Sequence, residues 1–362
     1  MSDEGYMSLA LNLAKRRKGL THPNPTVGCV IVKDGEIVGL GYHERAGYPH
    51  AEVVALEQAG EKARGSTAYI TLEPCTHFGR TPPCTDALIR AGVKKVFVAT
   101  KDLNPVVSGR GIEKLREEGI EVEVGLLEET ARELNEDFFT FVTEKRPFIT
   151  LKLAQTLDGK IATLRGESKW ITSLQSRKYA HRLRAEASAV LVGIKTVIRD
   201  NPSLTVRHFP FERQPLRIVI DPELEIPIES NLVSDGEAKT LVVFTRRNPS
   251  KERELEERGV ALLFMERIEL KDLLVELARR EVVHLLVEGG AFTVSSFLRE
   301  GLWDRLVLFQ APKILGDGLT LHNLGIEGIE NALRVKLVRE LRIKEDKVFE
   351  YRREEESTGL RW

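Results

Sequence analysis

The sequence predicts an α/β protein of two domains, and three observations support this prediction. First, the chain has 362 residues, and at about 150 residues per domain this length accommodates two separate cores. Second, the first half alternates between strand-like and helix-like stretches, an order typical of β-α-β units. Third, strand signals return after a charged segment marked by proline, Glu144-Lys145-Arg146-Pro147. We therefore expect one domain over residues 1–145 and a second over residues 146–362.

In the first half, apolar spacing and glycine positions mark each element. VGCVIVKDGEIVGLGY (27–42) has two apolar runs around Asp34-Gly35, the pattern of a β-hairpin. The elements expected after it are a helix over 51–60, a strand over 66–74, a helix over 84–92, a strand over 94–100 and a long helix over 128–143.

The second half carries more strand signals, separated by helical segments. The expected strands are FITLKLA (148–154), AVLVG (189–193), LRIVID (216–221), TLVVFT (240–245) and HLLVEGG (284–290). The clearest helices between them are SRKYAHRLRAE (176–186) and LKDLLVELARR (270–280). Residues 303–352 read as strands with turns, closing in a hairpin around Lys344-Glu345-Asp346.

Composition and charge exclude several classes of protein. Hydrophobic and charged residues make up 42% and 30% of the chain, which is typical of a globular protein. No apolar run approaches the ~20 residues of a membrane span, and the first residues lack the apolar core of a signal peptide. A net charge of −1 gives no indication of binding to nucleic acid. We therefore expect a cytoplasmic protein that acts on neither membrane nor nucleic acid.

The three cysteines, Cys29, Cys75 and Cys84, are too few for a disulfide framework and leave metal binding open. His50-Ala51-Glu52 is followed by Pro74-Cys75 and, after eight further residues, by Cys84. One imidazole and two thiolates suit Zn²⁺ and leave a fourth tetrahedral position for water, which the metal acidifies. Glu52 starts a helix two residues after His50, where it can carry protons without being a ligand. We predict a zinc site with ligands His50, Cys75 and Cys84 and with Glu52 as the catalytic residue.

Other readings of these residues remain open. A structural zinc site would be closed by a fourth protein ligand, for which His43 and His77 are available. We expect His77 to contribute to a substrate pocket instead, and Cys29 to be a core residue in a strand. Asn24 either hydrogen-bonds a substrate's ribose or base, or caps a turn.

The H-x-E and P-C…C pattern resembles that of the zinc nucleobase deaminases, most of which have only two residues between the cysteines. This chain has a longer insert between its cysteines, in PCTHFGRTPPC (74–84). That stretch resembles the deaminase domain of the riboflavin-pathway bifunctional deaminase-reductases, and so do PNPTVGCV (23–30) and DLNPVVSGRG (102–111). The resemblance implies an N-terminal α/β/α sandwich like that of cytidine deaminase, in which zinc-bound hydroxide displaces ammonia from a pyrimidine.

The second half offers less chemistry on its own. VHLLVEGGAFTVSSFL (283–298) reads as a strand, a Gly-Gly turn and a helix whose free amides suit a phosphate. It lacks the G-x-G-x-x-G spacing of a Rossmann dinucleotide site. However, LKLAQTLDGKIA (151–162), ESKWITS (167–173) and the stretch 181–207 resemble the reductase domain of the same family, which is similar to dihydrofolate reductase and uses NADPH.

This resemblance implies the reductase site residue by residue. The cofactor would contact Ala154, Trp170, Thr196, Asp200 and the turn formed by Gly290, Ala291, Phe292, Thr293, Val294, Ser295 and Ser296. The ribosyl phosphate substrate would contact Ser168, Arg184, Leu204, Arg207 and Glu288, with Lys152, Asp200 and Glu288 as candidate polar groups near the reacting carbon. One departure is Ser188, where many relatives have aspartate; we expect it to affect local capping.

The resemblance implies two successive reactions on one small molecule. The first is deamination of 2,5-diamino-6-ribosylamino-4(3H)-pyrimidinone 5′-phosphate, and the second is reduction of the ribosyl group to ribityl by NADPH. One alternative is a deaminase of another nucleobase or nucleotide with an accessory second domain. Another is a non-catalytic protein with structural zinc and a nucleotide-sensing second half. Two sites in series make a homo-oligomer plausible.

Overall fold

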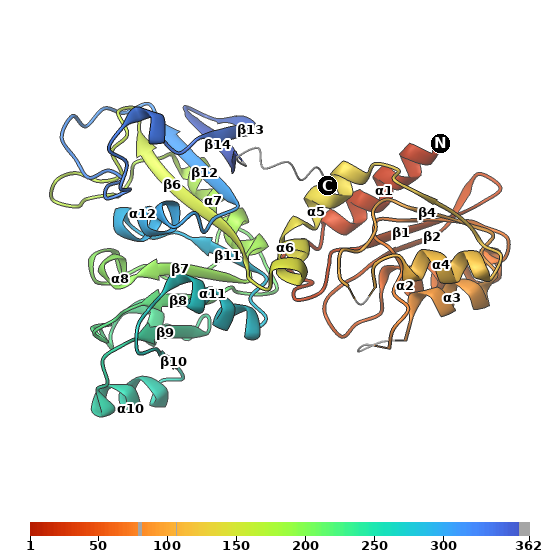
Figure 1. Ribbon diagram of the computed structural model, residues 1–362, viewed down its shortest axis with the longest axis horizontal. Helices are drawn as coiled ribbons and strands as arrows, with labels where there is room; N and C mark the ends of the chain where they lie inside the picture. The colour runs from red at the N-terminus through yellow and green to blue at the C-terminus, as the bar shows by residue number, and fades with distance from the viewer. Residues whose placement is uncertain (79–81, 106, 355–362) are drawn as a thin grey trace. The chain divides into compact units, whose positions relative to one another are not determined.

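The computed structural model describes residues 1–78, 82–105 and 107–354. The chain divides into two compact units, Met1–Arg146 and Pro147–Trp362 (Figure 1). Their junction lies one residue beyond the boundary drawn from the sequence. No helix within the described ranges is long and apolar enough to span a membrane.

The first unit is a three-layer α/β/α sandwich, as the family resemblance implies. Its sheet has the order β2-β1-β3-β4-β5, with β1 antiparallel to β2 and β3, and with β3, β4 and β5 parallel. The strands are β1 Gly28–Lys33, β2 Glu36–Tyr42, β3 Thr67–Ile70, β4 Lys95–Val98 and β5 Glu121–Val124. The helices are α1 Asp3–Lys15, α2 Ala51–Ala59, the short 3₁₀ helix Gly60–Ala63, α3 Cys84–Ala91, α4 Arg110–Glu117, α5 Glu128–Leu134 and α6 Glu136–Glu144.

Alternating residues of the strands divide the apolar core of this unit into two layers. Ile31, Ile70 and Val98 face α2, α3 and α4, whereas Val30 and Tyr69 face α1 and α5. Figure 1 shows these two groups of helices on opposite faces of the sheet. The period of two along each strand therefore produces the sandwich.

The helical stretch predicted over 128–143 is confirmed but not continuous, because the structure has two helices that meet at Asn135. The Asn135 backbone leaves the helical region, with φ −114°. Its side-chain oxygen accepts a hydrogen bond from the Thr26 amide at 2.7 Å, and its side-chain nitrogen donates to the Thr26 carbonyl at 3.0 Å. These two hydrogen bonds attach the break between the helices to the segment before β1, 109 residues away.

The second unit contains a nine-stranded sheet in the order β10-β9-β8-β7-β11-β6-β12-β14-β13. The strands are β6 Phe148–Thr156, β7 Ala189–Gly193, β8 Leu216–Ile220, β9 Thr240–Phe244, β10 Ala261–Phe264, β11 His284–Val287, β12 Arg305–Ala311, β13 Val335–Ile343 and β14 Asp346–Arg353. The first seven strands of that order are parallel, and the hairpin β13–β14 adds two antiparallel strands at one edge. The predicted turn of this hairpin, at Lys344-Glu345, is confirmed.

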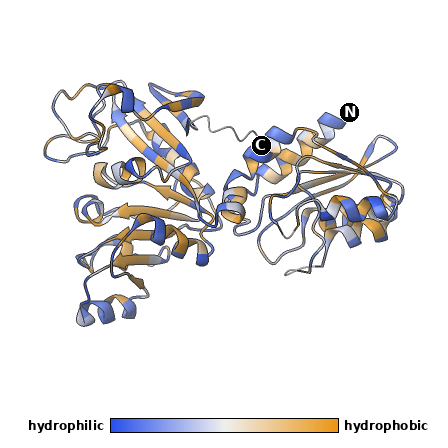
Figure 2. Cartoon of the chain, in the orientation of Figure 1, coloured by the Kyte–Doolittle hydropathy of each residue, from blue (hydrophilic) through white to orange (hydrophobic). Residues whose placement is uncertain are grey.

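Helices cover both faces of this sheet. They are α7 Leu174–Glu186, α8 Ile194–Asp200, α9 Asn231–Ser234, α10 Pro249–Glu257, α11 Leu270–Arg279 and α12 Ala291–Arg299, with a 3₁₀ turn at Ile329–Asn331. Helices α7 to α10 pack on one face, and α11 and α12 pack on the other. Figure 2 shows hydrophobic ribbon along the central strands and an alternation of hydrophobic and hydrophilic residues along the helices. In such parallel sheets, ligands bind where the carboxyl ends of the central strands diverge, here at β6, β7 and β11.

A candidate active site in each unit

The first candidate site consists of the three predicted zinc ligands. The Nδ1 atom of His50 and the Sγ atoms of Cys75 and Cys84 all lie within 4.8 Å of one another. His50 Nδ1 is 3.0 Å from Cys84 Sγ and 3.6 Å from Cys75 Sγ. Around a tetrahedral zinc ion with ordinary bond lengths, ligand atoms lie about 3.6–3.8 Å apart. The donor set therefore fits Zn²⁺, and the 3.6 Å distance to Cys75 Sγ matches this spacing, whereas the 3.0 Å distance to Cys84 Sγ is shorter.

Helix starts and one close backbone contact position these ligands. His50 is the N-cap residue of α2, and Cys84 is the first residue of α3. Helix α2 lies close against β2 because Gly41 has no side chain: a Cβ there would be 2.0 Å from the Ala51 carbonyl oxygen. The amide and the hydroxyl of Thr85 both donate to the Cys75 carbonyl at 3.2 Å. Each predicted zinc ligand therefore either stands at the start of a helix or, in the case of Cys75, is hydrogen-bonded to one.

The hydrogen bond between Cys75 and Cys84 shifts the pKa values of the two thiols in opposite directions. A hydrogen bond from Cys84 lowers the pKa of Cys75 to about 4, with His50 and the Cys84 amide contributing in the same direction. The same hydrogen bond, together with burial, raises the pKa of Cys84 well above its ordinary value. The site therefore holds one thiolate on its own, and a bound cation would displace the remaining proton.

Glu52 is buried beside this cluster but lies outside the group of three ligands. Burial raises the pKa of its carboxyl group, and the opposing effect of His50 is smaller. A carboxyl group that takes up a proton readily suits a proton carrier, as predicted from its position two residues after His50.

The remaining candidates of the first unit occupy different positions. His43 is buried, and its Nδ1 donates to the Pro49 carbonyl at 3.2 Å while its Nε2 accepts from the Asn24 side chain at 3.0 Å. His77 is exposed. Among the described residues, neither histidine belongs to the ligand group, which gives no support to a closed structural site. Cys29 is fully buried in β1, which confirms it as a core residue. Gly79, Arg80 and Thr81 of the cysteine insert lie outside the described residues.

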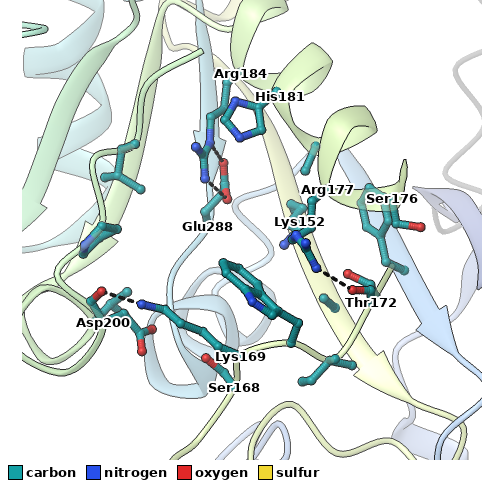
Figure 3. A pocket seen from close by; sticks show the side chains of 18 of the residues that line it. Lys152, Ser168, Lys169, Thr172, Ser176, Arg177, His181, Arg184, Asp200 and Glu288 are labelled. Atoms are coloured by element: carbon teal, nitrogen blue, oxygen red, sulfur yellow. Dashed lines mark hydrogen bonds and ion pairs between the residues drawn. The ribbon is translucent and has the colours of Figure 1, made fainter. Parts of the chain in front are cut away.

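The second candidate site is a cavity of about 610 Å³ at the carboxyl ends of β6, β7 and β11 (Figure 3). This volume lies within the range of small-molecule sites, about 300–1,000 Å³. Eleven of the predicted reductase residues line it, namely Lys152, Ala154, Ser168, Trp170, Arg184, Thr196, Asp200, Leu204, Arg207, Glu288 and Gly290. Segments far apart in the sequence therefore meet at the place where the family resemblance puts the reductase site.

An ion pair lies inside this cavity. Nε and Nη2 of Arg184 donate to the two carboxylate oxygens of Glu288 at 2.5 and 3.0 Å (Figure 3). Burial on its own would raise the pKa of Glu288, but Arg184 and, more weakly, Lys152 lower it to about 2. Burial lowers the pKa of Lys152, and Glu288 opposes this shift. Glu288 is thus an ionised carboxylate, whereas Lys152 is the group more easily deprotonated.

The turn after β11 contributes less to the cavity than predicted. Of Gly290 to Ser296, Gly290 alone is among the lining residues. Because 291–299 forms α12, Val294 faces the sheet and is fully buried in the core, so its side chain is not available to a ligand. The Ser295 hydroxyl instead accepts a hydrogen bond from the His322 amide at 3.2 Å. The start of α12 can still offer backbone amides to a phosphate.

The prediction missed several lining residues on α7. His181 and Arg177 line the cavity together with Arg184, and the guanidinium of Arg177 lies 4.1 Å from the centroid of the Trp170 ring. Residues 177, 181 and 184 have i, i+4, i+7 spacing, which places them on one helix face. That spacing is a signal in the sequence that could have identified them.

Ser188 joins two strands. Its hydroxyl accepts hydrogen bonds from the amides of Val283 and His284, each at 3.2 Å. The side chain that departs from many relatives therefore binds backbone amides where β11 begins, away from the cavity residues.

Both halves of the chain match known protein families. Residues 1–100 match the family described as cytidine and deoxycytidylate deaminase zinc-binding region, and residues 147–349 match the RibD C-terminal domain. The riboflavin biosynthesis protein RibD of Aquifex aeolicus is 60% identical over 351 residues, which cover 97% of this chain and 98% of that protein. The chain belongs to the RibD family.

Other RibD proteins are similar over nearly their whole length. RibD of Escherichia coli is 45% identical, over 93% of this chain and 95% of its own. The structure of Acinetobacter baumannii RibD is 41% identical with a TM-score of 0.91, covering 98% and 99% of the two chains. A Thermotoga maritima structure, described as a diaminohydroxyphosphoribosylaminopyrimidine deaminase/5-amino-6-(5-phosphoribosylamino)uracil reductase, is 39% identical with a TM-score of 0.88, covering 97% and 98%.

RibD membership confirms the two-part reading of the sequence. The chain is a bifunctional enzyme of riboflavin biosynthesis, with a deaminase domain that uses Zn²⁺ and a reductase domain that uses NADPH. An accessory, non-reductase second half is not favoured, because residues 147–349 match the RibD C-terminal domain. Small-molecule chemistry fits both sites.

Proposed function

We propose that the first unit deaminates 2,5-diamino-6-ribosylamino-4(3H)-pyrimidinone 5′-phosphate, and that the second unit reduces the ribosyl group of the product to ribityl. The Thermotoga maritima relative is described as having this pair of activities. The observation that carries the proposal is that His50, Cys75 and Cys84 converge in one unit while the reductase residues converge on one cavity in the other.

In the deaminase site, His50, Cys75 and Cys84 would hold Zn²⁺, which when bound lowers the pKa of a coordinated water molecule. Glu52 would take a proton from the attacking water and deliver protons to the ring nitrogen and the departing amine, so that water and the amino substrate become the carbonyl product and ammonia. Its raised pKa, caused by burial, supports this role. Asn24, oriented by His43, binds the base or ribose of the substrate.

In the reductase site, the substrate residues are Lys152, Ser168, Arg184, Leu204, Arg207 and Glu288. The NADPH residues are Ala154, Trp170, Thr196, Asp200 and the start of α12 from Gly290; NADPH when bound supplies the hydride. Arg207 suits the phosphate, because guanidinium groups bind phosphate oxygens in pairs. Glu288 remains ionised and orients Arg184, which leaves Lys152 as the better candidate to give a proton near the reacting carbon.

We also propose that the enzyme is cytoplasmic, acts on a free small molecule and forms a homo-oligomer. Its zinc site requires thiols, which a reducing cytoplasm preserves, and the three cysteines form no disulfide. The net charge of −1 favours a free small molecule over nucleic acid as the substrate. A homo-oligomer is part of the hypothesis, supported by the exposed apolar residues Val335, Leu337 and Val338 on the edge strand β13.

The test is a paired assay on the diaminopyrimidine ribosyl phosphate, which follows ammonia release and NADPH oxidation in one reaction. We expect ammonia to be released when NADPH is absent, and NADPH to be oxidised only after the substrate has been deaminated. A zinc chelator should stop both when the diamino substrate is supplied, but should spare the reduction of a substrate deaminated beforehand. Ammonia release without any NADPH consumption on either substrate would contradict the reductase half of the proposal.

A further inference from the structure

Glu73 is a buried carboxylate, 4% exposed, three residues after β3 and two residues before Cys75. Its described partners are four backbone amides. One carboxylate oxygen accepts from the Gly111 and Ile112 amides at 2.9 and 3.3 Å. The other accepts from the Gly109 and Asp102 amides at 3.0 and 3.2 Å. Four such contacts on one charged group constitute a strong backbone anchor.

Three of these amides belong to the start of helix α4. The N-cap of α4 is Gly109, which has no side chain to accept a hydrogen bond from the first turn. Gly111 and Ile112 are the second and third residues of the helix, where amides lack partners within the helix. Glu73 supplies the missing capping oxygen from 38 residues away and places a negative charge at the positive end of the helix dipole.

The helix also touches the backbone directly beside Cys75. A Cβ atom at Gly111 would lie 2.0 Å from the Pro74 carbonyl oxygen and 3.2 Å from the Glu73 side chain. Only glycine therefore lets α4 approach the Pro74-Cys75 peptide this closely. The Glu73 amide in turn donates to the Thr100 carbonyl at 3.0 Å, at the end of β4.

Cys75 is thus held from two sides. On one side, Thr85 of α3 binds its carbonyl with two hydrogen bonds. On the other side, the residues immediately before it are fastened to α4 through Glu73 and Gly111. Its Sγ must remain near His50 Nδ1, now at 3.6 Å, for the two to share one metal ion.

We infer that Glu73 is a positioning residue of the deaminase site: by anchoring the Glu73-Pro74-Cys75 segment to the start of α4, it keeps the Cys75 thiolate at metal-binding distance from His50 and Cys84. The inference rests on the proposed function, because the ligand set is the one assigned there. It concerns geometry and not proton transfer.

The test is Glu73→Gln in the full-length zinc enzyme. The glutamine side chain keeps the shape but replaces one acceptor oxygen by an NH₂ group facing two amides. Loss of groups that orient metal ligands commonly lowers metal affinity or activity about 10–100-fold. We therefore expect zinc release to a chromogenic chelator to become about 10-fold faster or more, and deaminase kcat to fall by a similar factor with little change in KM. Reductase kcat, measured on deaminated substrate, should stay within about twofold.

Two further measurements separate positioning from helix capping alone. In the cobalt-substituted protein, the thiolate-to-metal absorption band of Glu73→Gln should shift or weaken, because that band reports the geometry of the two thiolate ligands, one of which is Cys75. The control is Glu113→Gln, which removes an exposed charge from the first turn of the same helix and should leave both zinc release and the spectrum unchanged.

A Glu73→Gln enzyme with a lower melting temperature but wild-type zinc release, spectrum and deaminase kcat would overturn the inference. If that variant does not fold, Glu73→Asp, which keeps the charge but shortens the side chain, tests the same anchor, and wild-type zinc release there overturns the inference equally. A wild-type chain that binds zinc but releases no ammonia contradicts the proposed deamination instead, and the zinc-release comparison still decides the role of Glu73.

Discussion

The backbone amide of Arg207 donates a hydrogen bond to Nδ1 of His181 at 3.3 Å. This contact fixes the imidazole as a neutral ring with its proton on Nε2, at the wall of the reductase cavity. Burial, followed by the charges of Arg184, Arg207 and His208, lowers the pKa of His181 to about 3. The cavity therefore presents a neutral hydrogen-bond donor beside Arg184 and Arg207.

The neutral state of His181 predicts the pH dependence of stability. An unfolded histidine takes up a proton near pH 6.5, whereas folded His181 does so only near pH 3. Between these values the unfolded chain binds more protons, so His181 makes stability fall as the pH falls, by at most about 1.4 kcal/mol per pH unit. His181→Asn, which keeps an acceptor for the Arg207 amide, should flatten this slope.

The measurement is urea unfolding of both proteins at several pH values between 6.5 and 3, followed by tryptophan fluorescence. All three tryptophans, Trp170, Trp303 and Trp362, belong to the second unit, so the signal reports that unit. The exposed His322 supplies the control substitution, His322→Asn. Equal slopes for wild type and His181→Asn would show that the ring is already charged in the folded protein.

The Arg184–Glu288 pair predicts a large loss of stability when one partner is removed. The two side chains are only 12% and 8% exposed, and a buried ion pair that loses one member typically costs about 3–5 kcal/mol. Glu288→Ala should therefore lower the free energy of unfolding by about that amount and reduce reductase activity. Glu223→Ala, which breaks the exposed pair between Glu223 and Arg246, should cost at most about 1 kcal/mol. Similar losses in the two variants would contradict the difference in burial.

Sequence patterns were sufficient to predict site residues and strands where the pattern lies within a short stretch of the chain. The H-x-E and P-C spacing predicted His50, Cys75 and Cys84, which meet in the structure, and apolar periodicity predicted most strands. The break at Asn135 and the capping by Glu73 were not predictable in this way, because their partners lie 109 and up to 39 residues away. The reductase residues came from the family resemblance, since arginines and tryptophans alone are equally typical of surfaces and cores. Val294 was misplaced because a run of residues was expected to face a ligand, whereas a helix turns some of them into the core.

Substitution of the ligand cysteines should separate the two activities. Cys75→Ser and Cys84→Ser each remove a thiolate from the ligand group, and we expect zinc content to fall well below one ion per chain and deamination to be lost. Reduction of the deaminated substrate should remain within about twofold of wild type. Cys29→Ala is the matched control, because Cys29 is buried in the core of the same unit outside the ligand group. Elemental analysis and the two separate assays decide the outcome, and full zinc content in Cys84→Ser would remove it from the ligand set.

Glu52→Gln should abolish deamination without affecting the fold or zinc. Glutamine has the same shape but cannot carry protons from water to substrate, so we expect deaminase kcat to fall at least about 10²–10⁴-fold, the range for general acid–base catalysis. Zinc content and reductase kcat should be unchanged. Glu57→Gln, on the exposed face of the same helix, is the control and should deaminate normally. Near-normal ammonia release by Glu52→Gln would refute the proposed proton carrier.

Lys152→Met tests whether Lys152 takes part in the reduction. Lys152 lies on β6 at the cavity, with its Nζ 5.5 Å from the centroid of the Phe309 ring, and burial lowers its pKa towards a value at which it can release a proton. Methionine keeps the unbranched apolar stem and removes the proton donor, so we expect reductase kcat to fall about 10²-fold or more. Lys271→Met, on the exposed surface of α11, is the matched control. Single-turnover NADPH oxidation on the deaminated substrate measures the step directly. An unchanged rate would exclude Lys152 as the proton donor.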